Sequence, residues 1–131
     1  MSQENVEIAR RVFDALNCGD LSAAMKDIAP DFTFDFSRSK SFERGVYGRE
    51  ELPGLQENLD GVWESVRWEA TEFIEAGGEL ITPLTTHNRG RQGIEVQTTV
   101  AWLWSFRGGR IARVTFFQSR DEALEAAGLR E

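Results

Sequence analysis

The sequence predicts a single α+β domain, in which a curved antiparallel sheet forms a cone and helices close an internal pocket. Apolar residues in the first half recur at every third or fourth position, which is typical of helices that bury one face. From Trp63 onward, apolar and polar residues alternate in long segments separated by glycine-containing turns, which is typical of a strand meander. The 131 residues contain no linker or repeat, so we expect residues 1–131 to form one domain.

Two helices are expected at the start of the chain. Ser2 can cap the first, whose apolar face consists of Val6, Ala9, Phe13 and Leu16. Gly19 ends this helix, because glycine readily adopts the left-handed conformation that follows many helices. Asp20 is a suitable cap for a short second helix, which Pro30 stops because proline lacks the N–H that a helix needs.

A strand, a loop and a third helix follow. The segment from Asp31 to Ser37 alternates phenylalanine with polar residues, which predicts a strand with one apolar face. Residues 37–46 are polar and predict a loop. The third helix is expected over Glu50–Val62, with Pro53 near its start. Its apolar side consists of Leu52, Leu55, Leu59 and Val62.

The rest of the chain predicts a meander of four long strands. Their ranges are Glu64–Ala76, Glu79–Asn88, Ile94–Arg107 and Arg110–Ser119. A short helix over Asp121–Ala127 follows them. Pro83 lies inside the second strand and indicates a bulge there, because proline cannot donate to the ladder. A long antiparallel sheet covered by helices on one face curls strongly, and this curl predicts the cup.

The composition limits the partners and cofactors that we expect. The 22 Asp and Glu residues outnumber the 15 Lys and Arg residues, and the net charge of −7 disfavours nucleic acid and anionic membranes. With one cysteine, Cys18, and one histidine, the chain can form neither an internal disulfide nor a Cys/His zinc site. No apolar run is long enough to span a membrane, and Met1 to Arg11 lacks a signal-peptide core. We therefore expect a cytoplasmic protein without a metal or cofactor.

Four short segments carry a family resemblance: Phe13–Asp20, Tyr47–Leu52, Phe106–Ile111 and Arg120–Leu124. In this order and spacing they resemble the nuclear transport factor 2 superfamily, and most of all its SnoaL-like branch, which includes polyketide cyclases and is related to ketosteroid isomerases. The resemblance implies a cystatin-like α+β barrel roll, a homodimer and an internal pocket. Members of the superfamily include isomerases, cyclases, dehydratases, epoxide hydrolases and non-catalytic binders, so the fold does not decide the function.

The catalytic residues of the known relatives are absent here. The resemblance places the isomerase Tyr, the Asp base and the second Asp at Val12, Phe36 and Trp102. Val12 and Phe36 cannot transfer a proton and Trp102 only donates a hydrogen bond, so steroid isomerisation is not expected. The strands contain no Asp–Arg–Asp relay like that of limonene epoxide hydrolases. One histidine cannot supply the histidine pair of scytalone dehydratases.

The inward face of the sheet follows from the resemblance, which suggests that Trp102 points into the pocket. Period-two alternation then turns the same face of its strand inward: Val96, Thr98, Val100, Trp104 and Phe106. Pairing across a turn near Arg91 and Gln92 turns a set on the preceding strand inward: Ile81, Pro83, Thr85 and His87. On the last strand the inward residues are Val114, Phe116 and Gln118.

His87 and Asp35 are the candidate proton carriers. His87 is the only histidine, and an imidazole both takes and gives a proton near neutral pH. The alternative is that it is a half-exposed residue at a hairpin end. Asp35 adjoins the isomerase base position, although strict alternation turns it away from Phe34 and Phe36 toward solvent. If Asp35 lay in an apolar pocket, its pKa would be raised, as a proton-shuttling carboxyl needs.

Ligand contacts are expected from large and polar residues around the pocket. These residues are Val12, Phe36, Tyr47, Trp68, Trp102, Trp104, Phe116 and Gln118. Tryptophans can stack on a flat ligand, but at inward strand positions they are also ordinary core residues. Tyr47 and Gln118 would supply polar anchors.

Two classes of function remain open. The first is a cofactor-independent isomerase, cyclase or lyase that uses His87 or Asp35 on a small apolar or aromatic molecule. The second is a non-catalytic binder or dimeric interaction module of the same fold, which the loss of the isomerase residues favours. The outer sheet face carries Leu103 and Phe117 among Thr and Ser, and we expect it to join two copies in a homodimer.

Overall fold

The computed structural model describes residues 2–39 and 45–129. Its helices are α1 (Ser2–Asn17), α2 (Leu21–Ala24), the 3₁₀ turn η1 (Arg49–Glu51), α3 (Leu52–Val62) and α4 (Arg120–Ala126). Its strands are β1 (Ile28–Asp35), β2 (Val46–Gly48), β3 (Trp63–Ala70), β4 (Ile74–Ala76), β5 (Glu79–Gly90), β6 (Glu95–Arg107) and β7 (Arg110–Phe117). Part of the loop expected over 37–46, residues 40–44, lies outside the described residues.

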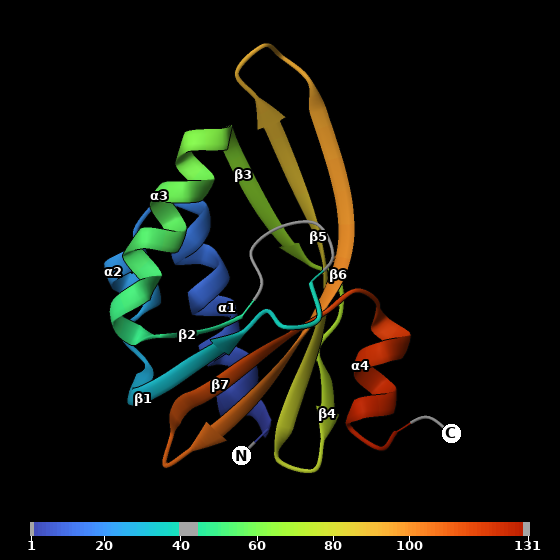
Figure 1. The fold of residues 1–131 in the computed structure, drawn as a ribbon. Coiled ribbons are helices and arrows are strands. Elements are labelled where there is room, and N and C mark those ends of the chain that lie inside the picture. The colour runs from blue at the N-terminus through green and yellow to red at the C-terminus, as the bar shows by residue number, and fades with distance from the viewer. Residues whose placement is uncertain (1, 40–44, 130–131) are drawn as a thin grey trace.

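One curved sheet contains all the strands, in the order β2-β1-β7-β6-β5-β3, with β4 pairing β5 beyond the end of β3 (Figure 1). The α+β class and the four-segment meander are confirmed. The sheet is mixed rather than purely antiparallel, because β1 runs parallel to β7. After β1 and β2 the chain crosses through α3 to β3 at the opposite edge and returns through the meander, which brings the last strand back beside the first in a parallel pair.

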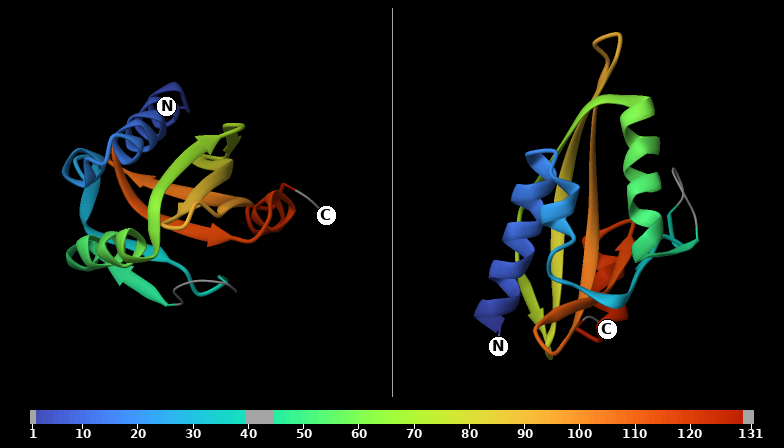
Figure 2. Two further views of the ribbon diagram at one scale, coloured as in Figure 1. Left: turned by 90° about the horizontal axis from the view of Figure 1, so that it is seen from above. Right: turned by 90° about the vertical axis from the view of Figure 1, so that its left-hand side faces the viewer.

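Helices cover both faces of the sheet, but in different regions (Figure 2). The α1 helix buries Ile8, Ala9 and Phe13 against the concave face, in a cluster that includes Trp102 and Trp104. On the opposite face, α4 buries its apolar residues in a second cluster with Phe117 and Ile81. The concave face therefore contributes to the main core, and this core continues into the wall of a pocket.

The second helix is shorter than the sequence suggested. Asp20 caps it as expected, with its carboxylate accepting a hydrogen bond from the backbone N–H of Ala23 at 3.0 Å. The helix ends at Ala24, and Ile28 already begins β1. Pro30 therefore lies inside a strand, in the stretch where the β1–β7 register is interrupted between Ile28 and Thr33. An interruption is where a strand tolerates a residue without an N–H.

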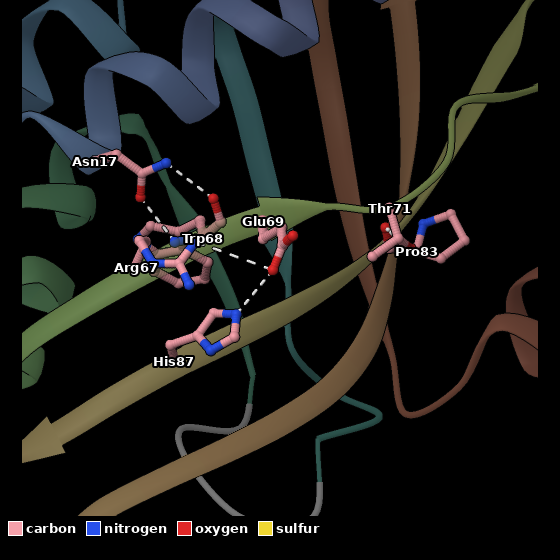
Figure 3. Close-up of polar contacts among 7 residues, drawn as sticks. All are labelled: Asn17, Arg67, Trp68, Glu69, Thr71, Pro83 and His87. Atoms are coloured by element: carbon pink, nitrogen blue, oxygen red, sulfur yellow. Dashed lines mark hydrogen bonds and ion pairs between the residues drawn. The ribbon is translucent and has the colours of Figure 1, made fainter.

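The long strand expected over Glu64–Ala76 is broken at residues 71–73, opposite Pro83. Ala70 pairs with Leu84 and Ile74 pairs with Ile81, so three residues of one strand face two of the other. The carbonyl of Pro83 accepts hydrogen bonds from the N–H and the hydroxyl of Thr71, at 2.9 and 3.1 Å (Figure 3). In an antiparallel ladder the N–H of a residue points to the same side as its carbonyl, so Pro83 lacks the donor on this side. The bulge predicted from Pro83 is confirmed.

The β5–β6 loop contains one residue more than the turn expected near Arg91 and Gln92. Arg89 pairs with Glu95, the N–H of Gly90 donates to the carbonyl of Ile94, and Gly93 has a φ of 86°. A three-residue loop with glycine in the left-handed region is a common hairpin connection. A change of one residue in register exchanges the two faces of a strand. The residues of β5 that share the face of Trp102 are consequently Leu80, Thr82, Leu84, Thr86 and Asn88.

Asn17 at the end of α1 holds the edge strand β3 in place (Figure 3). Its side-chain amide donates to the carbonyl of Trp68 at 2.8 Å and accepts from the N–H of Trp68 at 2.7 Å. The side chain thus satisfies the backbone of one residue on a strand edge that, within the described part of the chain, has no neighbouring strand on that side.

We expect Asn17→Ala to lower the free energy of unfolding by about 1–2 kcal/mol, because two neutral hydrogen bonds to backbone groups are lost. Urea denaturation followed by circular dichroism measures this change. Gln3→Ala on the same helix is the matched control, since the contact of its amide within the described residues is with Glu7, at 3.4 Å. Equal stability of the two variants would show that the contact between Asn17 and β3 contributes nothing.

Candidate functional site

A pocket of about 340 Å³ lies between the concave face of the sheet and helices α1 to α3. The helical and loop side of its wall consists of Leu16, Leu21, Ser39, Leu52, Leu55, Gln56 and Leu59. The strand side consists of Phe34, Phe36, Trp63, Val66, Trp68, Thr86, Asn88, Val96, Thr98, Val100, Trp102 and Phe116. This volume falls in the range of small-molecule sites.

The pocket wall is neutral. Among the lining residues that the structure describes, none has a side chain that titrates, and the polar groups are hydroxyls and amides. The polar lining residues are Ser39, Gln56, Thr86, Asn88 and Thr98. Within the described ranges no three His, Cys, Asp or Glu side chains come together in a geometry for a metal ion. The arrangement can enclose an apolar molecule and form neutral hydrogen bonds to it.

Aromatic rings dominate one part of the wall. Trp102 has ring-centroid distances of 5.4 Å to Phe13, 5.1 Å to Phe34, 5.5 Å to Trp68 and 5.8 Å to Trp104. These separations are typical of favourable ring pairs. Phe34 and Trp102 each contact several other rings, so this part of the wall is packed in a fixed shape and suits a flat ligand.

Of the residues expected to contact a ligand, Phe36, Trp68, Trp102 and Phe116 line the pocket. Four others lie elsewhere: Val12, Tyr47, Trp104 and Gln118. Val12 and Trp104 are buried in the core below the pocket wall. The indole N–H of Trp104 donates to the hydroxyl of Thr82 at 2.9 Å. The Tyr47 ring packs 6.0 Å from Phe36 and is not among the lining residues, and the backbone N–H of Gln118 donates to Glu122 of α4.

His87 lies on the outer face of the sheet (Figure 3). Its partner across β5–β6 is Gln97, while Thr86 and Asn88 on either side of it line the pocket. Its Nε2 is 2.9 Å from a carboxylate oxygen of Glu69, and Arg67 lies 3.9 Å from the same oxygen. The expected inward orientation of His87 is wrong, and so is that of Ile81, Pro83 and Thr85, because the hairpin loop contains one more residue than assumed.

Asp35 also points away from the pocket, between Phe34 and Phe36, which line it. It is nevertheless buried, and its carboxylate accepts hydrogen bonds from the hydroxyl and the N–H of Ser37, at 2.6 and 2.9 Å, and from Arg113 at 2.5 Å. Burial by itself raises the pKa of Asp35, but these bonds outweigh it and hold the pKa below its ordinary value of 3.8. The carboxyl therefore stays ionised, whereas a proton-shuttling carboxyl needs a raised pKa.

Several lining residues were not identified as site residues from the sequence. Leu52, Leu55 and Leu59 belong to the apolar stripe that predicted α3, so the signal for them was present. Thr86 and Asn88 gave no such signal, because their inward orientation depends on the length of the β5–β6 loop. Ser39 lies in a loop where no periodicity applies.

The fold is shared with other solved structures. TerC co-crystallized with polyporic acid has a TM-score of 0.78 and 17% identity, over 95% of this chain and 98% of that one. A hypothetical protein from Catenulispora acidiphila with a ketosteroid isomerase-like fold, in complex with trimethylamine, gives 0.73 and 21%, over 94% and 93%. A protein of unknown function from Xanthomonas campestris with a cystatin-like fold gives 0.73 and 19%, over 96% and 98%.

These structures place the chain in a class of cystatin-like α+β folds that includes proteins crystallised with small ligands. The profile of the SnoaL-like domain matches residues 9–114, so the chain belongs to the SnoaL-like family. The expected family is thereby confirmed. No curated protein sequence matches the chain. Among the described residues, no helix is long and apolar enough to cross a membrane.

Proposed function

We propose that this protein binds a neutral, flat and mostly apolar small molecule in the pocket, and that no pocket side chain acts as an acid or base. The observation that carries the proposal is the chemistry of the wall: aromatic and aliphatic residues with a few neutral hydrogen-bonding groups. An enclosed apolar wall gains affinity by removing apolar ligand surface from water. A charged ligand would lose its hydration there without gaining a counter-charge.

The chemistry of the pocket wall favours a non-catalytic binder over an isomerase, cyclase or lyase. Acid/base catalysis needs a titratable group within hydrogen-bond reach of the substrate. The two candidates, His87 and Asp35, are both on the outer side of the sheet and each is already paired with a charged residue. The three isomerase positions hold Val12, Phe36 and Trp102. The ligands crystallised with TerC and with the Catenulispora acidiphila protein support a small-molecule pocket in this fold.

Thr98→Trp is expected to weaken binding of the neutral fluorophore N-phenyl-1-naphthylamine by at least about tenfold. Thr98 lines the pocket from an exposed position on β6, so an indole there fills the cavity without entering the packed core. A fluorescence titration measures the affinity. Thr99→Trp is the matched control, because Thr99 is equally exposed on the same strand but faces the outer side.

The wild-type protein and Thr99→Trp should bind the fluorophore alike. Failure of the wild-type protein to bind the fluorophore, or equal binding by all three proteins, would contradict the proposal. His87→Ala and Asp35→Asn are expected to keep wild-type affinity, because neither side chain touches the pocket.

The expected homodimer and cytoplasmic location remain proposals. Leu103 packs in the cluster under α4 and Phe117 is buried there, so they do not form the open surface assumed for a dimer. The part of the outer face that remains for a second copy is polar and includes Thr85, Gln97 and Thr99. Light scattering coupled to size exclusion tests the dimer, and charge substitution at Gln97 and Thr99 is expected to dissociate it.

A further inference from the structure

One polar atom of the pocket wall has no hydrogen-bond partner among the described residues. The Oδ1 atom of Asn88 is buried and accepts no hydrogen bond. A buried acceptor without a donor is costly to keep, because the group has lost its hydration. Ser39 has a buried, unpartnered hydroxyl as well, but it adjoins residues 40–44, so we base the inference on Asn88, whose strand neighbours are all described.

Asn88 belongs to a small polar patch on the sheet side of the pocket. Thr86 and Thr98 are directly paired across β5–β6, and Asn88 is the next pocket-facing residue along β5. Residues two apart on a strand are separated by about 7 Å. One functional group of a ligand can therefore lie close to all three side chains. The other strand residues that line the pocket are aromatic or aliphatic.

Gln56, the other amide on the wall, is in a different situation. Its amide nitrogen donates to the carboxylate of Asp60 at 3.0 Å, one helical turn along α3. It therefore has a partner within the protein, whereas the acceptor of Asn88 has none among the described residues. Of the two amides on the wall, Asn88 is therefore the one with a buried acceptor that no described residue satisfies.

We propose that Asn88 is the ligand-binding residue that accepts a hydrogen bond from a hydroxyl group of the bound molecule, and that the natural ligands are aromatic or polycyclic alcohols and phenols. This inference rests on the proposed binding function. A hydroxyl donates to Oδ1 and can at the same time accept from Thr86 or Thr98. An ether or ketone offers no donor, and a carboxylate or ammonium would be buried against a neutral wall.

The test uses three probes that differ at one group: 4-phenylphenol, 4-methoxybiphenyl and biphenyl. Each competes with N-phenyl-1-naphthylamine for the wild-type protein, for Asn88→Leu and for the control Gln56→Leu. Leucine keeps the branched shape and the number of heavy atoms of asparagine, with a larger volume, but removes its hydrogen bonds. The measured quantity is the affinity ratio of 4-phenylphenol to biphenyl, because the difference in probe hydration cancels when this ratio is compared between proteins.

We expect Asn88→Leu to lower this ratio by about tenfold and to leave the affinity for biphenyl unchanged or improved. The ratio of 4-methoxybiphenyl to biphenyl should not change, since that probe has no donor. Gln56→Leu should keep the wild-type ratio. The melting temperature of free Asn88→Leu is expected to equal or exceed that of the wild-type protein, because a buried unpaired acceptor is removed.

Three outcomes would overturn the inference in different ways. If all probes displace the fluorophore but the ratio for 4-phenylphenol is the same in Asn88→Leu, the hydroxyl subsite is wrong and the binding function stands. If neither the fluorophore nor any probe binds the wild-type protein, the proposed function fails and the subsite fails with it. A fall in the melting temperature of Asn88→Leu by several degrees would assign Asn88 a structural role instead.

Discussion

Trp102→Ala is expected to lower the free energy of unfolding by about 3–5 kcal/mol, the usual cost of truncating a buried aromatic residue. Trp102 is 4% exposed, and its ring contacts Phe13 of α1, Phe34 of β1 and Trp68 of β3. One side chain thus connects the first helix with β1 and with β3, which lie in opposite halves of the sheet. Because a domain of this kind is stable by only about 5–15 kcal/mol, the variant should unfold at a much lower urea concentration.

The matched control for this experiment is Trp63→Ala. Trp63 also lines the pocket, but it is only half-buried at the point where α3 passes into β3. Its removal should cost less than half as much as the removal of Trp102. Equal losses from the two substitutions, or a loss below about 1.5 kcal/mol for Trp102→Ala, would contradict a central role for the ring cluster.

The sequence predicted the fold well wherever local chemistry decides the structure. Asp20 caps α2, Gly19 is left-handed with a φ of 74°, and Pro53 lies in the first turn of α3. Phe34 and Phe36 share the pocket face of β1, as their alternation predicted. Each of these features depends on a few neighbouring residues, which the sequence states directly.

The prediction was wrong for β5, where one additional residue in the loop decides which face of the strand points into the pocket. Alternation along β6 was assigned correctly from Trp102, and Val96 and Thr98 line the pocket. Alternation along β5 was also correct, but the wrong set of alternate residues was placed inward, because the loop contains Gly93 as an additional residue. His87, the one histidine of the sequence, therefore lies outside the pocket, and Asn88 lines it instead. Periodicity gives the set of residues on each face, but the turn decides which set points inward.

Long-range contacts of polar residues could not be predicted from the sequence either. Asn17 is the last residue of α1 and gives no sign that it will bind the backbone of Trp68, 51 residues later. Asp35 was expected on a solvated face, but Arg113 of the neighbouring parallel strand and Ser37 enclose it. The parallel β1–β7 pair that brings Asp35 to Arg113 depends on the path of the chain through α3 to the far edge of the sheet and back through the meander, which no local pattern encodes.

Asp35→Asn is expected to lower the free energy of unfolding at pH 7 by about 1–2 kcal/mol. The carboxylate is 11% exposed and receives three hydrogen bonds, from two groups of Ser37 and from Arg113. Bonds to a charged acceptor are stronger than neutral ones, but the Arg113 side chain is 50% exposed, so solvent screens part of this contribution. In the Asp35→Asn variant, the N–H group of the new amide also faces one of these hydrogen-bond donors, which is unfavourable.

The pH dependence of this effect follows from the direction of the pKa shift. Because the pKa of Asp35 is lower in the folded protein than its ordinary value of 3.8, the folded state favours the ionised carboxyl. This stabilisation is fully present above pH 3.8 and is lost as the pH falls through the folded-state pKa, which lies below 3.8. The difference in stability between the wild-type protein and Asp35→Asn should therefore be constant near neutral pH and shrink in acid.

Urea denaturation of both proteins at several pH values between 7 and 2.5 measures this difference. Asp31→Asn is the matched control, because Asp31 lies on the same strand and is paired with Arg107, but its side chain is 70% exposed. An exposed ion pair contributes little, so this substitution should change stability by less than about 0.5 kcal/mol at every pH. If the difference in stability between the wild-type protein and Asp35→Asn grows as the pH falls below 4, the carboxyl is protonated in the folded protein. Asp35 would then again be a candidate proton carrier.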